Sequence, residues 1–287
     1  MNLYPDSKDL INLISKNQPM SPADFANLLR ANNWALAFSF VNVAEVMIRE
    51  DLPLCRERLR VIETLPARFI QVFTNIVKLE LQAAVEAFNS AQEFVRPDPY
   101  VDRWYQTYTP PGRADYQEML VNYRLEDQVI PLVYGNPAIL QNVRSGGDFY
   151  RAAVAQDRNA ADRERRSMER FSNSVEVHLR NCGLFDQVQD MEGFVTWLSQ
   201  DPERCPSLQF FNAIYLEFAA NVQDLGCDSD PGDLAHISTL PYVDAMTIDR
   251  RYRDYTTRAI RRFEARQPGL DYSRRVFADF RVFARSI

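Results

Sequence analysis

Histidine, cysteine and lysine are scarce in this chain of 287 residues, which has two histidines, four cysteines and three lysines. No two cysteines form a C-x-x-C pair, so we expect no structural zinc site. Their spacing does not suggest a disulfide framework, which fits a reducing compartment. Apolar runs stay well short of the ~20 residues of a membrane span. The first residues, MNLYPDSKDL, lack the basic and then apolar build of a signal peptide. We therefore expect a cytoplasmic protein with no membrane partner.

The charge balance is acidic, with 39 Asp and Glu residues against 33 Lys and Arg, for a net charge of −6. This argues against a broad nucleic-acid-binding surface but leaves room for a local basic groove. Nearly all basic residues are arginine, the better bidentate ligand for phosphate. Genome composition is the simpler explanation of that bias.

The hydrophobic pattern alternates between strands and helices at both ends of the chain. Predicted strands cover residues 2–5, 35–40, 242–248 and 275–283, and 67–73 is either a strand or the start of a helix. Predicted amphipathic helices include residues 7–15, 22–31, 51–62, 75–94, 207–222 and 250–266. This alternation is typical of an α/β protein with a mainly parallel sheet.

The middle of the chain has a different pattern. Residues 95–112 form a Pro- and Tyr-rich loop, and the following residues up to about 204 are mostly helical in pattern with few strand signals. We therefore divide the chain into an α/β domain, residues 1–94 and 205–287, and a mostly helical insertion or subdomain, residues 95–204. The insertion is a candidate surface for a protein partner or a homo-oligomer.

Carboxylates follow several of the predicted strands. Asp6 ends the first strand, Asp249 ends the 242–248 strand, and Glu45 lies on the helix after the second strand. Asp233 opens the short helix that precedes the late strand. Because ligands gather at the carboxyl ends of parallel strands, we expect these four acids to converge. Mutual repulsion would then be relieved by a hard divalent cation, Mg²⁺ or Mn²⁺.

The segments that contain these four acids resemble the PIN-like domain nucleases. The segments that carry the resemblance are LYPDSKDLINLI with Asp6, AFSFVNVAEV with Ser39 and Glu45, GDLAHI with Asp233, and AMTIDRRY with Thr247 and Asp249. The resemblance covers roughly residues 1–90 and 205–287. It implies a three-layer α/β/α sandwich and Mg²⁺- or Mn²⁺-dependent hydrolysis of phosphodiesters, commonly in RNA. The large helical insertion and the additional acid Asp244 depart from the family pattern.

Further residues are candidates for supporting roles. Thr247 or Ser39 would orient a carboxylate or a water, and His236 shares a helix face with Asp233. Asp244, inside the predicted late strand, is either part of the site or a buried partner of an arginine. The last candidates are Glu80, which faces either the same sheet edge or the core, and Arg250 and Arg251, which would contact the substrate phosphate.

Each acid also has a plainer explanation. Asp6 and Asp249 can cap the helices that follow them, and Glu45 can be an ordinary first-turn acid. Asp228 and Asp230 compete with Asp233 for the role in the site. The sequence supports two hypotheses: a metal-dependent nuclease, or a non-catalytic interaction protein that keeps the fold.

Overall fold

The structure, a computed structural model, describes residues 1–15, 20–47, 51–108, 124–134, 154, 163–221, 223–224 and 230–287. The strands are β1 (Asn2–Tyr4), β2 (Ala35–Phe38), β3 (Ala67–Ile70), β4 (Tyr100–Val101), β5 (Ala245–Thr247) and β6 (Val276–Phe277). The helices of the N-terminal part are α1 (Ser7–Ile14), α2 (Pro22–Ala31), α3 (Phe40–Glu45), α4 (Leu52–Thr64) and α5 (Phe73–Ser90). Those after them are α7 (Leu125–Tyr134), α9 (Arg163–Cys182), α10 (Met191–Gln200), α11 (Pro206–Ala220), α12 (Asp230–Ile237), α13 (Arg250–Arg266) and α14 (Phe280–Ala284). Four 3₁₀ helices join them: η1 (Trp104–Thr107), η2 (Phe185–Gln187), η3 (Leu240–Tyr242) and η4 (Tyr272–Arg275).

The strands form one sheet in the order β4-β3-β2-β1-β5-β6. All neighbouring pairs are parallel except β3 and β4, which are antiparallel. In the centre of the sheet, Leu3 of β1 pairs with Leu36 of β2 and with Ala245 of β5. The N- and C-terminal parts of the chain therefore meet in adjacent strands, β1 and β5.

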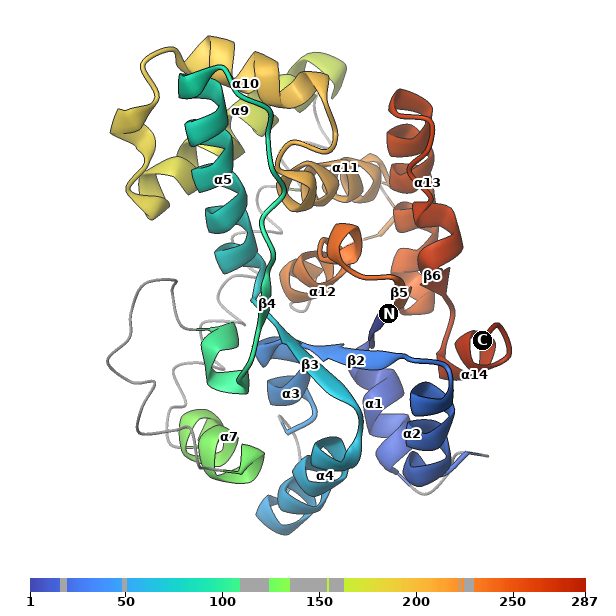
Figure 1. Cartoon of the computed structure of the whole chain (residues 1–287). Coiled ribbons are helices and arrows are strands. Elements are labelled where there is room, and N and C mark those ends of the chain that lie inside the picture. Colours follow the sequence, from blue (N-terminus) through green and yellow to red (C-terminus); the bar gives the residue numbers. More distant parts are fainter. Residues whose placement is uncertain are drawn as a thin grey trace.

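Helices cover both faces of this sheet (Figure 1). Leu3, Leu36 and Phe38 point into one core, which α1 to α4, α7 and α14 close. Tyr4 and Met246 point into a second core on the opposite face, which α11, α12 and α13 close. This in-and-out alternation follows from the pleat of the strands. The prediction of an α/β fold with a mostly parallel sheet is confirmed.

A third core lies away from the sheet, among α5, α9, α10 and α11. It joins residues of the predicted insertion to two helices of the predicted α/β domain, since Leu81 of α5 and Leu208 of α11 are both part of it. Elsewhere in the predicted insertion, β4 extends the sheet and α7 packs in the first core. The described parts of 95–204 are thus mostly helical, as predicted, but they are packed against the α/β elements rather than separate from them.

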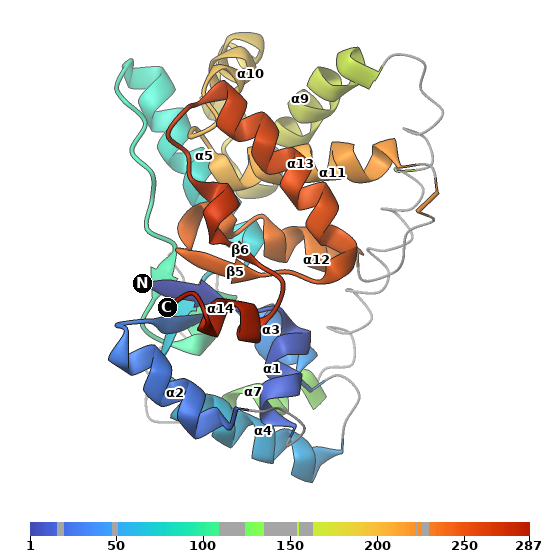
Figure 2. The same cartoon turned by 90° about the vertical axis from the view of Figure 1, so that its right-hand side faces the viewer.

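The prediction of a last strand over residues 275–283 is wrong for most of its length. Only Val276 and Phe277 pair with β5, and the chain then turns into α14. The Asp279 carboxylate caps α14 by accepting from the backbone N–H groups of Arg281 and Val282. Phe280 and Phe283, three residues apart, then bury the same helix face in the core. Figure 2 shows α14 beside the sheet, on the side of α1 and α2.

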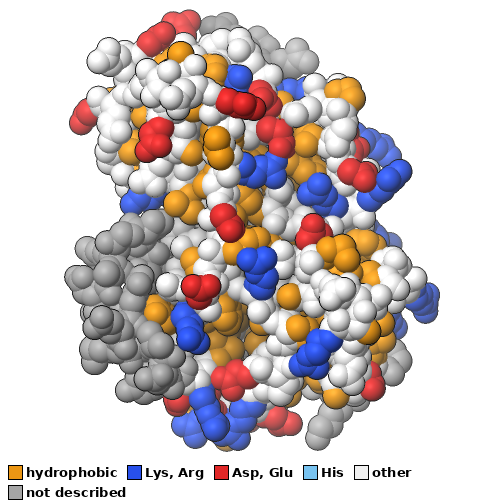
Figure 3. Space-filling view, in the orientation of Figure 1, with side chains coloured by type: hydrophobic (Ala, Val, Ile, Leu, Met, Phe, Trp, Pro, Cys, Tyr) orange, Lys and Arg blue, Asp and Glu red, His pale blue; other side chains and the backbone are white. Residues whose placement is uncertain are grey.

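The surface has mixed charge on the face seen in Figure 3, where acidic and basic side chains are interspersed. Within the described residues, no helix is long and apolar enough to cross a membrane.

Candidate active site

A cavity of about 380 Å³ opens at the carboxyl ends of β1 and β5, and we call it the acidic cavity. Its walls contain all four of the predicted carboxylates, Asp6, Glu45, Asp233 and Asp249. They come from four separate segments of the chain. The remaining lining residues include Tyr4, Ser7, Lys8, His236, Thr247, Arg251 and Tyr252. The sequence-based expectation that these acids converge therefore agrees with the structure.

Asp6 and Asp249 each lie two residues beyond a strand, and the two strands are neighbours. The backbone N–H of Asp6 donates to Thr247 Oγ1 at 2.8 Å, which ties the ends of β1 and β5 together. Asp6 caps α1 by accepting from the N–H of Lys8, and Asp249 caps α13 by accepting from the N–H of Arg251. Capping and a place in the cavity wall are thus compatible, because the caps use one carboxylate oxygen each.

Lys8 forms an ion pair with Asp249. Its Nζ lies 3.1 Å from Asp249 Oδ2, with the lysine side chain 67% exposed. Burial raises the pKa of Asp249, but the N–H of Arg251 and the Lys8 ammonium lower it more, so that it lies below its usual range. For Asp6 the balance is opposite: burial raises its pKa, and the charges of Asp249 and Glu45 add to the rise, while the N–H of Lys8 and the charge of His236 oppose it. The pKa of Asp6 therefore lies above its usual range.

Glu45 ends α3 and reaches the opposite wall of the cavity. It accepts a short hydrogen bond from the Ser7 hydroxyl, and its Oε2 lies 3.6 Å from His236 Nε2. That distance is too long for a hydrogen bond but suits an ion pair. Burial lowers the pKa of His236, yet the charges of Glu45 and Asp233 raise it more, and the net shift is upward. Glu45 responds in the opposite sense, since burial raises its pKa and His236 and Ser7 together bring it below its usual value.

A second set of hydrogen bonds holds the other ring nitrogen of His236, Nδ1. Its Nδ1 is bonded to the hydroxyl of Tyr4, and that hydroxyl shares a 3.0 Å hydrogen bond with Ser39 Oγ. Ser39 also caps α3 through Asn42. Ser39 itself does not line the cavity, so its contribution is to position Tyr4, His236 and the helix that carries Glu45.

Asp233 and Asp230 have different surroundings on α12. Asp233 is part of the cavity wall, and its charge raises the pKa of both His236 and Tyr252. Asp230 is fully buried and its Oδ1 lies 2.6 Å from Arg251 Nη1. The competing assignment to Asp230 is therefore not favoured, because that carboxylate is already neutralised. Asp228, the other alternative, lies outside the described residues.

Arg250 and Arg251 line different cavities. Arg251 lines the acidic cavity but is engaged by two carboxylates, Asp224 at 2.6 Å and Asp230 at 2.6 Å. Its first role is thus to hold Asp224 and α12 against α13. Arg250 is exposed and lines a neighbouring cavity.

Two of the supporting residues expected from the sequence lie elsewhere. Asp244 precedes the short strand β5, is exposed, and accepts from the N–H of Asn2 at 2.7 Å, at the amino end of the strands. Glu80 is fully buried on α5 and caps α11, accepting from the N–H of Ser207 and from the Tyr242 hydroxyl. Neither lines the acidic cavity, and the prediction that they support the site is wrong. The error for Asp244 arose from extending the strand by three residues in front of Ala245.

Asp9 is a further carboxylate near the site that the sequence reasoning missed. It is buried, lies one helical turn beyond Asp6 on α1, and its Oδ2 has no hydrogen-bond partner among the described residues. Burial raises the pKa of Asp9 to about 7; the charges of Asp6 and Asp279 also raise it, and a hydrogen bond with Thr247 opposes the rise. Its spacing of three residues from Asp6 was a usable signal, since such pairs share a helix face.

The acidic cavity fits a hard divalent cation by the chemistry of its donors. Its four carboxylates supply oxygen ligands of the kind that Mg²⁺ and Mn²⁺ prefer. In the arrangement seen here, the four side chains do not form a set of metal ligands. Within the described ranges, no group of three or more His, Cys, Asp or Glu side chains lies close enough to hold a metal ion. Binding would therefore require Lys8 to leave Asp249 and Glu45 to turn from Ser7 and His236.

Comparisons with known proteins identify no relative of this chain. No family model matches the sequence, and neither the curated proteins nor the solved structures give a match. The assignment of a function therefore rests on the residues of the cavity and on their arrangement in this chain.

Proposed function

We propose that the protein is a Mg²⁺- or Mn²⁺-dependent nuclease that hydrolyses phosphodiester bonds, with RNA as the substrate that the resemblance to PIN-like nucleases implies. One observation carries the proposal. Four carboxylates, from segments more than 240 residues apart at the extremes, line one cavity at the carboxyl ends of adjacent parallel strands. This is the position at which open α/β sheets bind their ligands.

The residues of the cavity would divide the work as follows. Asp6, Glu45, Asp233 and Asp249 would hold the cation. When bound, such a cation lowers the pKa of a water and stabilises the negative charge that develops on phosphate. Thr247 keeps the backbone of Asp6 in place through their 2.8 Å hydrogen bond, and Ser39 keeps Tyr4 against His236. Arg250, exposed beside the cavity, would contact the phosphate.

A non-catalytic interaction protein is the second candidate. The observation that favours it is the internal neutralisation of the site, since Lys8 pairs with Asp249 and His236 with Glu45. A protein that never binds a cation would keep such pairs permanently. The helices packed around α5 and α11 would then be the surface for a protein partner or a second copy. We place the protein in the cytoplasm under either proposal.

Cleavage assays separate the two candidates. The purified protein is incubated with single-stranded RNA and DNA in Mn²⁺, and in parallel in EDTA, beside Asp6→Asn and Asp249→Asn. Asp244→Asn is the matched control, because it makes the same chemical change at the opposite edge of the sheet. We expect metal-dependent cleavage by the wild type and by Asp244→Asn, reduced at least 100-fold in the two site variants.

Either of two results would reject the nuclease proposal. One is equal cleavage by wild type and site variants, which would trace the activity to a contaminant. The other is the absence of cleavage together with the absence of Mn²⁺ binding by calorimetry. The second result is the one that the interaction-protein hypothesis predicts.

A further inference from the structure

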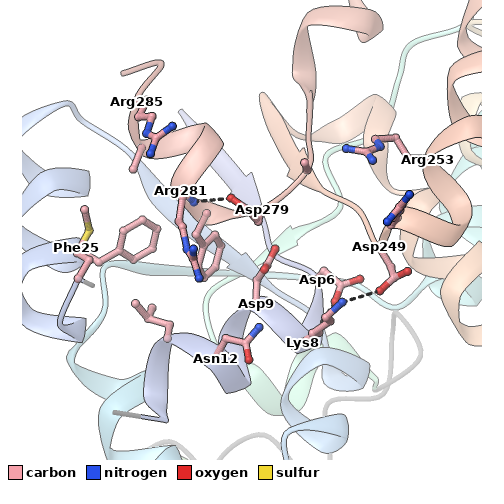
Figure 4. A pocket seen from close by; sticks show the side chains of 16 residues that line it. Asp6, Lys8, Asp9, Asn12, Phe25, Asp249, Arg253, Asp279, Arg281 and Arg285 are labelled. Carbon is pink, nitrogen blue, oxygen red and sulfur yellow. Dashed lines mark hydrogen bonds and ion pairs between the residues drawn. The ribbon is translucent and has the colours of Figure 1, made fainter. Parts of the chain in front are cut away.

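A second cavity of about 510 Å³ adjoins the acidic cavity, and we call it the arginine pocket (Figure 4). The two cavities share Asp6, Lys8 and Asp249 in their walls. The acidic cavity contacts residues of the core on one face of the sheet, including Tyr4 and Met246. The arginine pocket contacts residues of the other core. A ligand in the arginine pocket would therefore lie directly beside the proposed cation site.

The inner wall of the arginine pocket is apolar. Leu13 of α1, Phe25 of α2 and Phe280 of α14 form it, and all three are buried. The rings of Phe25 and Phe280 lie with centroids 4.7 Å apart at an interplanar angle of 31°. Such a wall suits a flat, apolar group. The volume lies within the ~300–1,000 Å³ of typical small-molecule sites.

The wall of the pocket carries five cationic side chains, of Lys8 and four arginines, and four carboxylates, those of Asp6, Asp9, Asp249 and Asp279. Three of the carboxylates are engaged: Asp6 and Asp279 accept backbone N–H groups, and Asp249 accepts one and pairs with Lys8. The arginines of the wall are Arg250, Arg253, Arg281 and Arg285. Figure 4 shows Arg253 and Arg285 on different elements around the same opening. Within the described part of the chain, Arg250, Arg253 and Arg285 have no carboxylate partner. The pocket thus favours an anionic ligand.

One polar atom inside the pocket is also unsatisfied. Asp9 is 8% exposed, lines the pocket, and its Oδ2 has no hydrogen-bond partner among the described residues. A buried polar atom without a partner is costly, and native structures usually satisfy it with water or a ligand. Asn12 lies one turn away on the same helix and adds an amide to the same wall. Together they offer hydrogen bonds to the polar edge of a group whose faces are apolar.

We propose that the arginine pocket binds one unpaired nucleotide of a single-stranded substrate, next to the bond that is cleaved in the acidic cavity. The base would lie against the wall formed by Leu13, Phe25 and Phe280, with its edge toward Asp9 and Asn12. Its phosphates would contact Arg253 and Arg285. The inference rests on the proposed function, since it names the part of the substrate that is recognised beside the same site.

The pocket presents three kinds of surface: an apolar wall, hydrogen-bonding groups on Asp9 and Asn12, and arginines. A nucleotide matches them with the flat faces of its base, the polar edge of its base and its phosphate. A simple apolar anion would use the inner wall and the arginines but would leave Asp9 unsatisfied. A paired base would have to leave its duplex to enter, at a cost of a few kcal/mol. The pocket therefore selects a single strand over a duplex.

Binding in EDTA tests this inference without cleavage. A fluorescein-labelled twelve-nucleotide uridine strand is titrated with the wild type, Arg253→Ala, Arg285→Ala and the double variant, and anisotropy is recorded. Arg261→Ala is the matched control, because Arg261 is an exposed arginine on the same helix as Arg253 and does not line the pocket. We expect each pocket variant to weaken binding about tenfold, as a lost charge-assisted hydrogen bond does. Arg261→Ala should bind as the wild type does.

Two further measurements define the ligand. Ala284→Trp, which fills the pocket, should weaken strand binding while the thermal unfolding midpoint shows that the variant is folded. Uridine monophosphate should displace the strand, whereas inorganic phosphate and dodecanoate at equal concentration should not. A twelve-base-pair RNA duplex should bind more weakly than the single strand.

The outcomes of this test and of the cleavage assay are separable. Cleavage that depends on Asp6 and Asp249, with strand binding and cleavage unchanged in the arginine variants, would overturn the inference and leave the nuclease proposal standing. Strand binding that needs Arg253 and Arg285, without any cleavage and without Mn²⁺ binding by calorimetry, would support the pocket and reject the nuclease. Equal displacement by dodecanoate, or preference for the duplex, would overturn the recognition of a base.

Discussion

At the residue scale, the site is defined by how its carboxylates are neutralised. Glu45 has His236 and Ser7, and Asp249 has Lys8 and the N–H of Arg251. Asp6 accepts the N–H of Lys8 and is influenced by the charge of His236. Because Lys8 is 67% exposed, its ion pair with Asp249 is screened by water and worth little energy. If the proposed divalent cation binds, Lys8 would compete with it for Asp249 but would not prevent its binding.

We predict that Lys8→Ala tightens the binding of Mn²⁺ several-fold, because the variant removes the competing ammonium. Isothermal titration calorimetry measures the affinity directly. Lys78→Ala on α5 serves as the control, since it removes the same charge away from the cavity. Unchanged or weaker Mn²⁺ binding by Lys8→Ala would contradict the competition.

Arg251 and Arg250 are adjacent in sequence but differ in what their loss should do. Arg251 neutralises the fully buried Asp230, whereas Arg250 is exposed. Removing one partner of a buried ion pair leaves a buried charge and costs about 3 kcal/mol. We predict that Arg251→Ala lowers the free energy of unfolding in urea by about that amount and that Arg250→Ala leaves it nearly unchanged. Equal stability of the two variants would show that Asp230 is neutralised by another group.

The residue types of the site were predictable, but their surroundings were not. Carboxylates after predicted strands were enough to name Asp6, Glu45 and Asp249, and Asp233 was named from its place at the start of the helix before the late strand. Whether Asp9 is buried depends on α14 and β5, which lie more than 230 residues away in the sequence. The sequence likewise offered no sign that Lys8 would reach Asp249. Contacts between distant segments follow from packing, and a local pattern does not contain them.

At the element scale, caps decide where the helices around the site begin. Asp6, Ser39 and Asp249 each accept a backbone N–H at the start of a helix that follows a strand. The helix over residues 250–266 has the bounds that were predicted for it. The strand predicted over 275–283 was wrong because its apolar residues also fit a helix, and the Asp279 cap decided for the helix. Short apolar runs leave that choice open in a sequence.

The N-terminus of α11 is held by a buried carboxylate, Glu80 of α5. Burial raises the pKa of Glu80 to about 7, although the N–H groups of Ser207 and Leu208 and the Tyr242 hydroxyl oppose the rise. The folded state thus binds the Glu80 proton more tightly than the unfolded state does, where the pKa is ~4.3. The stability from this group is fully present below that unfolded value and is lost as the pH rises through about 7.

We predict that Glu80→Gln loses less stability than the wild type when the pH is raised from 5 to 8. The variant cannot ionise at this position, so its stability relative to the wild type should rise as the pH increases to about 7 and level off above it. Urea unfolding at each pH gives the two free energies. Glu86→Gln, at an exposed position of the same helix, is the control. A constant difference between Glu80→Gln and wild type across this range would show that Glu80 does not titrate there.

At the scale of the whole molecule, an acidic protein would bind an anionic substrate through a local basic opening. The net charge is −6, and the face in Figure 3 shows acidic and basic side chains interspersed. Arg250, Arg253 and Arg285, which have no carboxylate partner among the described residues, lie at the arginine pocket. Binding should then depend on a few phosphate contacts rather than on a broad field.

We predict a shallow dependence of strand binding on salt. With three arginines in contact with a single strand, the slope of log K against log salt should be about −2, since each neutralised phosphate contributes roughly −0.7. Anisotropy titrations from low to moderate salt in EDTA give the slope. The double variant Arg253→Ala/Arg285→Ala should reduce its magnitude by about 1.4. A steep slope that the variant leaves unchanged would place the strand on another surface.

The most direct test of the proposed cation site is anomalous diffraction from crystals of the wild-type protein grown with Mn²⁺. We predict an anomalous peak in the acidic cavity with oxygen ligands from Asp6, Glu45, Asp233 and Asp249, and with Lys8 turned away from Asp249. Crystals of Asp249→Asn should show that peak weakened or lost. A wild-type cavity without a peak, in which the Lys8–Asp249 and His236–Glu45 pairs remain closed at saturating Mn²⁺, would contradict the proposal.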